Sequence, residues 1–387
     1  MKRQRQTIFL KLLLFVLFTL SISLLWLFFI TVGYTEHKVK ETINSQPFVV
    51  STNKLSLEYP PLNPRKNSNI SNIDLIFAGD TCLDVGAKQN INQYGVDYPF
   101  HQVKEEVIQA DFSILNLETA VTKRTTPYPK KYNYKSTVES LKGIKNAGFD
   151  LVSLANNHTM DYGTEGLIDT FNNLKAFNIP YIGAGLNAVE AFKAHTEIIS
   201  GKRIKFLTFS NVLPDSNWFV SVNKTGLASG YNINIIEQII MKEKETADHV
   251  FVYIHWGKER SEQPLDKNRT WARQMIDAGA SGVIGSHPHV LQGFEVYKGK
   301  PIAYSIGNFV FGGKTGLTAQ TGLLHINISP KDQIKFYFTP YIIENFTPIK
   351  VSEEKKKDML KYLESISYGV FINKNTGSIT SNYYVKK

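Results

Sequence analysis

The chain has 387 residues, of which 42% are hydrophobic and 20% are charged, and its formal net charge is +10. This length suits about two ordinary domains or one large α/β domain with appendages. The apolar fraction excludes a disordered chain, and the glycine and proline content excludes a fibrous one. The single cysteine, Cys82, excludes an intramolecular disulfide and zinc sites built from several cysteines.

The charge is unevenly distributed along the chain. Four basic residues near the N-terminus supply +4 without an acid among them: Lys2, Arg3, Arg5 and Lys11. The remaining +6 is too small and too scattered to favour nucleic-acid binding.

An uninterrupted apolar segment follows this basic flank of residues 1–11. Residues 12–34 carry no charge, and about 20 apolar residues suffice to cross a bilayer as a helix. The positive-inside rule then predicts a cytoplasmic N-terminus and an extracellular main domain. A cleaved signal peptide is the alternative, but its apolar core would be about 7–15 residues long and would end in small residues. The sequence therefore favours an uncleaved, single-pass signal anchor in the cell membrane.

After the anchor, the polar and proline-containing residues 35–72 are typical of a stalk. Apolar strand patterns and helical patterns then alternate, and this predicts one layered α/β domain over 73–346 and a helical, polar tail over 347–387. Residues 290–346 are mostly β-like. Earlier strands are expected at 73–79, 112–118, 151–156, 203–209, 249–255 and 281–286, and helices at 99–109, 137–148, 163–178 and 268–278.

Polar residues that can bind a metal follow the predicted strands repeatedly. Sites in α/β sheets gather beyond the carboxyl ends of the strands, and oxygen with imidazole donors suits Mn, Fe, Zn or a similar divalent ion. Each residue alone also has an ordinary explanation, such as a turn, a helix cap or a hydrogen-bonded surface histidine. The residues are Asp80, Asn116, Glu118, Asn156, Asn157, His158, His255, His287 and His289.

The order of these residues resembles that of a known superfamily. Gly79-Asp80, Asn116-x-Glu118, Asn157-His158, His255 and His287-x-His289 are arranged as in the calcineurin-like metallophosphatases. More closely, AGDTCL, NLETAV, LANNHTMDYG, IHWG, GSHPHVLQG and YSIGNFVFG resemble segments of the CapA-type poly-γ-glutamate capsule synthesis proteins. The resemblance covers roughly residues 73–313. It implies a layered metallophosphatase-like β-sandwich flanked by helices, preceded by one N-terminal transmembrane helix.

The resemblance also implies roles for single residues. His158 would lie beside a divalent metal and donate a proton or a hydrogen bond to a leaving oxygen. A metal there would lower the pKa of a water molecule and polarise a phosphoryl or acyl oxygen. Asn308, with Asn116 and Asn156, would line the cleft. The implied metal ligands are Asp80, Glu118, Asn157, His255, His287 and His289.

Two positions depart from the metallophosphatase pattern. Cys82 occupies a place where those enzymes commonly have a histidine, and Glu118 a place where they commonly bridge two metals with an aspartate. Cys82 is either a soft thiolate ligand at the cleft or a small buried residue after a strand. The departures leave open one metal, a weak second metal site, or a protein without catalysis.

The loop over residues 123–135, KRTTPYPKKYNYK, joins five basic residues to three tyrosines. It is either a solvated surface loop or a cationic lip that holds a polyanion through Lys130, Lys131 and Lys135.

Three functions fit these patterns. The first is a membrane-anchored protein that acts with membrane subunits in the synthesis, export or anchoring of poly-γ-glutamate. The second is an independent extracellular metal-dependent phosphoesterase or amide hydrolase. The third is a non-catalytic module that binds the anionic polymer.

Overall fold

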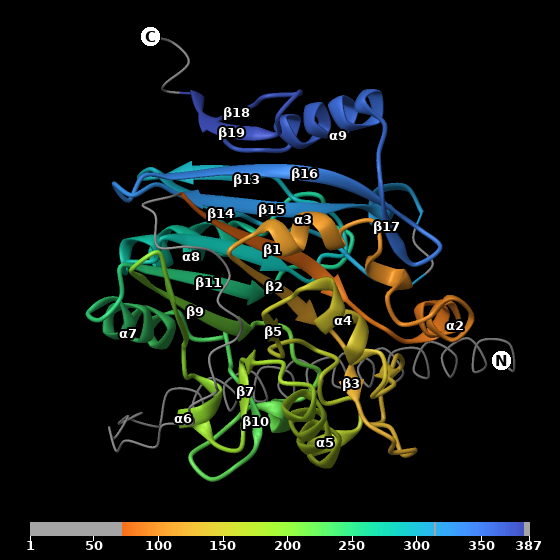
Figure 1. Cartoon of the computed structure of the whole chain (residues 1–387). Helices are drawn as coiled ribbons and strands as arrows, with labels where there is room; N and C mark the ends of the chain where they lie inside the picture. Colours follow the sequence, from red (N-terminus) through yellow and green to blue (C-terminus); the bar gives the residue numbers. More distant parts are fainter. Residues whose placement is uncertain (1–71, 313–314, 383–387) are drawn as a thin grey trace, which may run out of the picture. The chain divides into compact units, whose positions relative to one another are not determined.

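The computed structural model describes residues 72–312 and 315–382, which form a mixed α/β fold with two main sheets (Figure 1). The larger sheet has the strand order β18-β19-β16-β15-β1-β2-β5-β6, with β17 paired to β16. Its strands are β1 (Ile73–Thr81), β2 (Phe112–Leu117), β5 (Leu151–Ser153), β6 (Tyr181–Ile182), β15 (Gln320–Ile328), β16 (Ile334–Glu344), β17 (Thr347–Lys350), β18 (Val370–Ile372) and β19 (Ser378–Ser381).

The second sheet has the order β13-β14-β12-β11-β9-β8. Its strands are β8 (His195–Ile199), β9 (Lys202–Ser210), β11 (His249–His255), β12 (Gly282–Ser286), β13 (Phe294–Tyr297) and β14 (Lys300–Ala303). Two short pairs complete the β-structure: β3 (Ala120–Val121) with β4 (Lys135–Ser136), and β7 (Ala184–Gly185) with β10 (Gly226–Leu227). The strands predicted at 73–79, 112–118, 151–156, 203–209, 249–255 and 281–286 are all present, although β5 is shorter than predicted.

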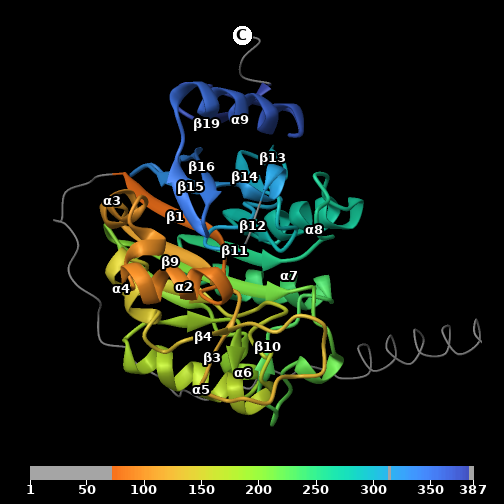
Figure 2. The ribbon, with the colours of Figure 1, turned by 90° about the vertical axis from the view of Figure 1, so that its right-hand side faces the viewer.

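Helices flank the two sheets, which lie between them in both views (Figure 2). The helices are α2 (Val85–Tyr94), α3 (Lys104–Gln109), α4 (Leu141–Ala147), α5 (Gly163–Ala176), α6 (Ala188–Ala191), α7 (Ile233–Lys244), α8 (Asp266–Asp277) and α9 (Glu353–Ser365). The helix predicted over 99–109 is divided into a 3-10 turn, Tyr98–Phe100, and α3. Phe100 and Val103 are both buried, and their spacing of three suits the tighter turn.

Alternate side chains of β1 show how the layers pack. Phe77 belongs to the core between the sheets, with its ring centroid 6.2 Å from Phe206 and 6.1 Å from Phe251. Its neighbours Ile76 and Ala78 belong to a different core, formed with the helices that cover the larger sheet. This alternation follows from the two-residue period of a strand. The strand is therefore buried on both faces, as its continuous apolar run predicts.

A buried ion-pair network fixes α3 against the larger sheet. His325 of β15 lies 3.1 Å from Asp74 of β1 through Nδ1 and 2.8 Å from Glu106 of α3 through Nε2. Tyr341 donates to the second oxygen of Glu106 at 2.6 Å. Burial alone would lower the pKa of His325, but its hydrogen bonds and ion pairs with both carboxylates outweigh burial and raise it.

The C-terminal segment is part of the larger sheet. β17 and β19 both pair with β16, and Leu360 and Leu363 of α9 are buried in the core between the sheets. The boundary predicted at residue 346 therefore does not mark the end of the folded unit. The sequence pattern identified the helix correctly, but the short strands around it were too brief to be recognised.

The predicted cytoplasmic flank 1–11 and anchor 12–34, together with all but the last residue of the stalk 35–72, lie outside the described residues. Among the helices that the structure describes, none combines the length and the hydropathy needed to cross a bilayer.

Candidate metal centre

The carboxyl ends of strands from both sheets meet at the candidate site. Asp80 of β1 pairs in register with Asn116 of β2, and His255 of β11 pairs with Ser286 of β12. The Tyr253 hydroxyl donates to the Ala78 carbonyl at 2.7 Å, which ties the two sheets together just before these ends. Because β1, β2, β11 and β12 each end here, their polar terminal residues converge.

A close backbone contact places Asn308 in the same site. A Cβ atom on Gly79 would lie only 2.0 Å from the Gly307 carbonyl oxygen, so only glycine fits there. The contact lets the Asp80 amide donate to the Gly307 carbonyl at 3.0 Å. Asn308 then lies beside Asp80 as a bridge partner, and its Oδ1 lies 2.9 Å from Nδ1 of His289.

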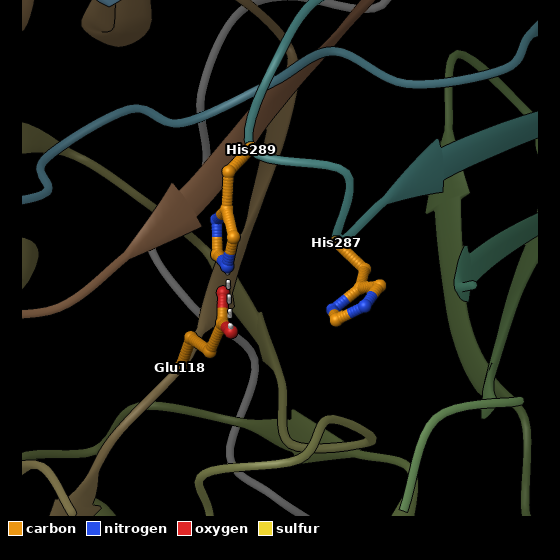
Figure 3. A group of neighbouring side chains, drawn as sticks. All are labelled: Glu118, His287 and His289. Carbon is orange, nitrogen blue, oxygen red and sulfur yellow. Dashed lines mark ion pairs between the residues drawn. The ribbon is translucent and has the colours of Figure 1, made fainter. Parts of the chain in front are cut away.

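Two groups of buried ligand atoms form at this edge, and the first of them is drawn in Figure 3. One consists of Glu118, His287 and His289, and the other of Asp80, Glu118 and His255; within each group the atoms lie within 4.8 Å of one another. Glu118 belongs to both, and its Oε1 lies 3.8 Å from Nε2 of His289 and from Nε2 of His255. Glu118 is thus placed where a carboxylate can bridge two positions.

The spacing of the donor atoms fits a divalent ion. Nε2 of His255 lies 2.9 Å from Oδ1 of Asn157 and 3.1 Å from Nδ1 of His287. Donors bound to one ion at about 2.1 Å lie about 3.0 Å apart in an octahedral site and about 3.4 Å apart in a tetrahedral one. All six ligands implied by the resemblance lie in this one region, from strand ends of both sheets. Carboxylate, amide and imidazole donors suit Mn, Fe or Zn.

The backbone of the His-Pro-His segment is held in an uncommon conformation. His287 has φ of 94° and His289 has φ of 57°, values that cost a residue other than glycine about 1–3 kcal/mol each. The His287 amide donates to Oδ2 of Asp80 at 3.1 Å, and the Pro288 carbonyl accepts from the Arg260 amide at 2.7 Å. These contacts hold both imidazoles near Glu118 although the backbone that carries them is strained.

The protonation states in this region favour metal binding. Burial, with smaller effects of His289 and His158, lowers the pKa of His255 to about 3. Burial and the neighbouring imidazoles also lower the pKa of His287 well below its usual range. Burial opposes ionisation of Asp80, but hydrogen bonding to His289 and the imidazoles around it hold its pKa far below the usual value. At neutral pH His255 and His287 therefore keep the free lone pairs that a metal requires, beside an ionised carboxylate.

His158 faces the candidate centre, and Asp161, which is not one of the predicted ligands, orients its ring. Its Nδ1 lies 2.8 Å from Oδ2 of Asp161, so Nδ1 is the donor and Nε2 points toward Glu118, 4.0 Å away. The Tyr134 amide donates to the same Asp161 oxygen at 2.6 Å. Asp161 is not among the site residues predicted from the sequence. Its signal was its position three residues after His158 within NNHTMDYG.

Two of the predicted cleft residues support the ligands. Asn116 donates to Oδ1 of Asp80 at 2.8 Å. Asn156 donates to Oδ1 of Asn116 at 3.0 Å and accepts from the His158 and Thr159 amides at 3.0 Å each. Asn156 therefore holds the turn that carries His158, but it does not cap the following helix, because the N-cap of α5 is Tyr162.

Cys82 lies outside both groups of ligand atoms. It is buried, and its backbone amide donates to the Val310 carbonyl at 2.7 Å. Burial raises the pKa of its thiol well above the ordinary value. Of the two predictions for Cys82, the small buried residue after a strand fits the structure.

The three lysines predicted to bind a polyanion differ in their surroundings. Lys131 is exposed. Lys135 is half-buried, donates to the Arg124 carbonyl at 2.6 Å and lies over the Tyr162 ring. Lys130 points inward and forms an ion pair with Asp161 at 2.5 Å. A polyanion at this loop would therefore meet the exposed Lys131 but not Lys130.

The family comparison matches most of this region. The family model described as bacterial capsule synthesis protein PGA_cap matches residues 74–313. This chain belongs to that family. As a capsule synthesis protein, it is 34% identical over 288 residues to the "PGA biosynthesis protein CapA" of Bacillus subtilis, covering 74% of each chain. It is 30% identical over 306 residues to the "Capsule biosynthesis protein CapA" of Bacillus anthracis, covering 77% of this chain and 73% of that protein. The resemblance inferred from the motifs is confirmed.

Solved structures resemble this capsule synthesis protein more distantly. A hypothetical protein from Thermus thermophilus aligns with a TM-score of 0.42 and 16% identity, covering 72% of this chain and 97% of the other. A 5'-nucleotidase from Candida albicans aligns with a TM-score of 0.40 and 13% identity, covering 75% of this chain and 55% of the other.

Proposed function

We propose that this protein is anchored in the cell membrane, faces outward, and acts in the synthesis, export or anchoring of an anionic capsule polymer, poly-γ-glutamate, with a divalent metal at its centre. Membership of the capsule synthesis family supports the pathway, and the name of the Bacillus subtilis relative, "PGA biosynthesis protein CapA", supports the polymer. The apolar residues 12–34 support the anchor and, with it, association with membrane subunits of the polymer machinery.

The observation that carries the metal centre is the convergence of buried carboxylates and neutral imidazoles from two sheets. Asp80, Glu118, Asn157 and the histidines 255, 287 and 289 would hold the ion. Once bound, the ion would supply Lewis-acid polarisation of a phosphoryl or acyl oxygen. His158 would move a proton at Nε2, while Asp161 holds its Nδ1 and stabilises the imidazolium that forms.

The placement of His158 favours a second candidate function, an independent metallophosphatase-like phosphoesterase or amide hydrolase. An imidazole aimed at a carboxylate-rich centre and backed by a buried aspartate is the arrangement that general acid–base chemistry needs. Turnover of generic phosphodiesters and γ-glutamyl amides by the purified protein, with and without a chelator, tests this. Turnover that the chelator abolishes would favour the hydrolase, and its absence at full metal occupancy would exclude it.

A genetic experiment tests the main proposal. Deleting the gene should abolish surface polymer, and the wild-type gene should restore it. Asp80→Ala and His287→Ala should fail to restore it, whereas the exposed controls Asp358→Ala and His101→Ala should succeed. Normal surface polymer in the deletion strain would overturn the capsule function. Restoration by both site variants would overturn the need for the metal centre alone.

A further inference from the structure

Lys130 belongs to the basic loop 123–135, but its side chain points toward the proposed metal centre and pairs with the buried Asp161. It lies between β3 and β4, and its side chain is only 14% exposed, whereas the next residue, Lys131, is exposed. The Lys130 ammonium lies 5.1 Å from the centroid of the Trp218 ring, a buried residue that closes one side of its surroundings. A lysine in this position is not available to an external polyanion in the way a surface lysine is.

The ammonium of Lys130 contacts the segment 157–161, which carries the predicted site residues Asn157 and His158. It donates to the Asn157 carbonyl at 2.5 Å and pairs with Oδ1 of Asp161 at 2.5 Å. It also lies 3.2 Å from Nδ1 of His158. Lys130 occupies one oxygen of Asp161, so the other oxygen is left for His158. One side chain thus contacts the backbone of a predicted metal ligand and the aspartate that orients the predicted proton carrier.

Burial makes this arrangement costly. Desolvation lowers the pKa of Lys130, and Asp161 and Glu118 oppose that effect. A buried ion pair is weak evidence for stability, because desolvation offsets much of the attraction. The ion pair instead contributes to the geometry of the site. An ammonium bound to two acceptors restricts where the Asn157 backbone and the Asp161 carboxylate can lie.

We propose that Lys130 is a positioning residue, which holds the Asn157 backbone and Asp161 so that Oδ1 of Asn157 and Nε2 of His158 face the metal centre. This role rests on the proposed metal centre for its functional meaning. It replaces direct polyanion contact as the function of this lysine. The neighbouring Lys131, which shares its charge but not its contacts, provides a matched control.

The experiment uses the purified full-length chain, freed of metal with a chelator and titrated with Zn²⁺ or Mn²⁺. Lys130→Met should weaken metal affinity about 10–100-fold, the usual effect of removing a residue that orients a ligand. Lys131→Met should leave affinity unchanged, and Lys130→Arg, which keeps the charge, should restore most of it. Wild-type affinity in Lys130→Met, or equal losses in both methionine variants, would overturn the proposal.

A second measurement separates this role from the proposed function. Hydrogen exchange in the metal-free protein, followed by mass spectrometry of peptides covering residues 154–162, reports the order of the segment that Lys130 holds. Exchange there should rise in Lys130→Met and return toward wild type in Lys130→Arg, even if the wild-type chain binds no metal. Unchanged exchange in Lys130→Met would overturn the positioning role, and unchanged exchange elsewhere in the chain shows that this variant folds.

Discussion

Two buried histidines of this molecule, His255 and His325, have pKa values that are shifted in opposite directions. Burial is the largest influence on the pKa of His255 at the proposed metal centre and on that of His325 of β15, and in both it disfavours the charged ring. His325 touches a carboxylate with each ring nitrogen, and its pKa is raised. His255 instead contacts the amides of Asn116 and Asn157, and its pKa is lowered.

The difference separates two uses of a buried imidazole. A ring with carboxylates on both nitrogens is protonated and acts as the cation of a structural ion pair. A ring that is hydrogen-bonded to amides, with its neighbouring carboxylate oxygens 3.8 Å away, stays neutral and keeps a lone pair for a metal. The direction of the pKa shift therefore separates the predicted ligand His255 from a buried histidine that the sequence motifs do not include.

Loss of a proposed metal ligand is expected to have the largest effect. Asp80→Ala and His287→Ala each remove a donor from the converging groups, so metal affinity should fall by more than the roughly 100-fold typical of an outer residue. Elemental analysis after dialysis of the purified protein measures this. His325→Gln should retain the full metal content; if it loses metal as His287→Ala does, the two groups are not functionally distinct.

The second prediction concerns stability and pH. His325→Gln breaks a buried ion pair and should reduce the free energy of unfolding by about 3 kcal/mol. The pKa of His325 is raised from 6.5, so its contribution is complete below that pH and is lost as the pH rises through the folded-state value. The pKa of Glu106 is lowered from 4.5, so its contribution is complete above that pH and is lost in acid.

Urea denaturation at several pH values, with His101→Gln as an exposed control, tests this window. The difference between wild type and His325→Gln should be largest between pH 4.5 and 6.5. A difference that grows steadily above pH 6.5 would show that His325 is not the cation of the pair.

The third prediction sharpens the assignment of His158. Asp161→Asn removes the carboxylate that accepts from its Nδ1 but leaves the ligand groups in place. Any phosphodiester turnover of the metal-loaded wild type should fall about 10–100-fold in this variant, whereas bound metal should fall much less than in His287→Ala. Equal turnover in wild type and variant would remove His158 as a proton carrier.

The smallest effect is expected at Cys82. Cys82→Ala removes a buried sulfur that lies outside both ligand groups, so stability should fall by about 1 kcal/mol while metal content stays at the wild-type level. Thermal unfolding and elemental analysis of the same preparation measure both quantities. Loss of metal would restore the thiolate-ligand prediction.

Much of the candidate site could be predicted from the sequence because its proposed ligands lie at strand ends. Apolar runs such as 73–79 and 249–255 identify strands by composition, and the polar residues after them converge because parallel strands end at one edge. The inward path of Lys130 could not be predicted in this way, since a loop of 123–135 has no periodic pattern. The left-handed backbone at His287 likewise depends on contacts with Asp80 rather than on local propensity.

Some of the fold was missed although a local signal was present. Helix α7 begins after Asn232, whose side chain accepts from the Asn234 amide, and buries Ile236 and Ile240 at helical spacing. Helix α2 has a weaker local signal in the sequence, because it has no side-chain cap and begins at Val85, whose φ is 50°. Short strands such as β17 and β19 are fixed by their pairing with β16, which no local window contains.

The pairing of β1 with β15 has a consequence for how the chain reaches this fold. Ile73 lies opposite Ile328, and Asn90 donates to the carbonyl of Asn345, which is 255 residues away. Contacts at such separation slow folding, because the loop must close before they form. During synthesis β1 therefore remains unpaired on one edge until β15, residues Gln320–Ile328, has been made. A chain ended before β15 would expose that apolar strand edge and is expected to aggregate rather than fold.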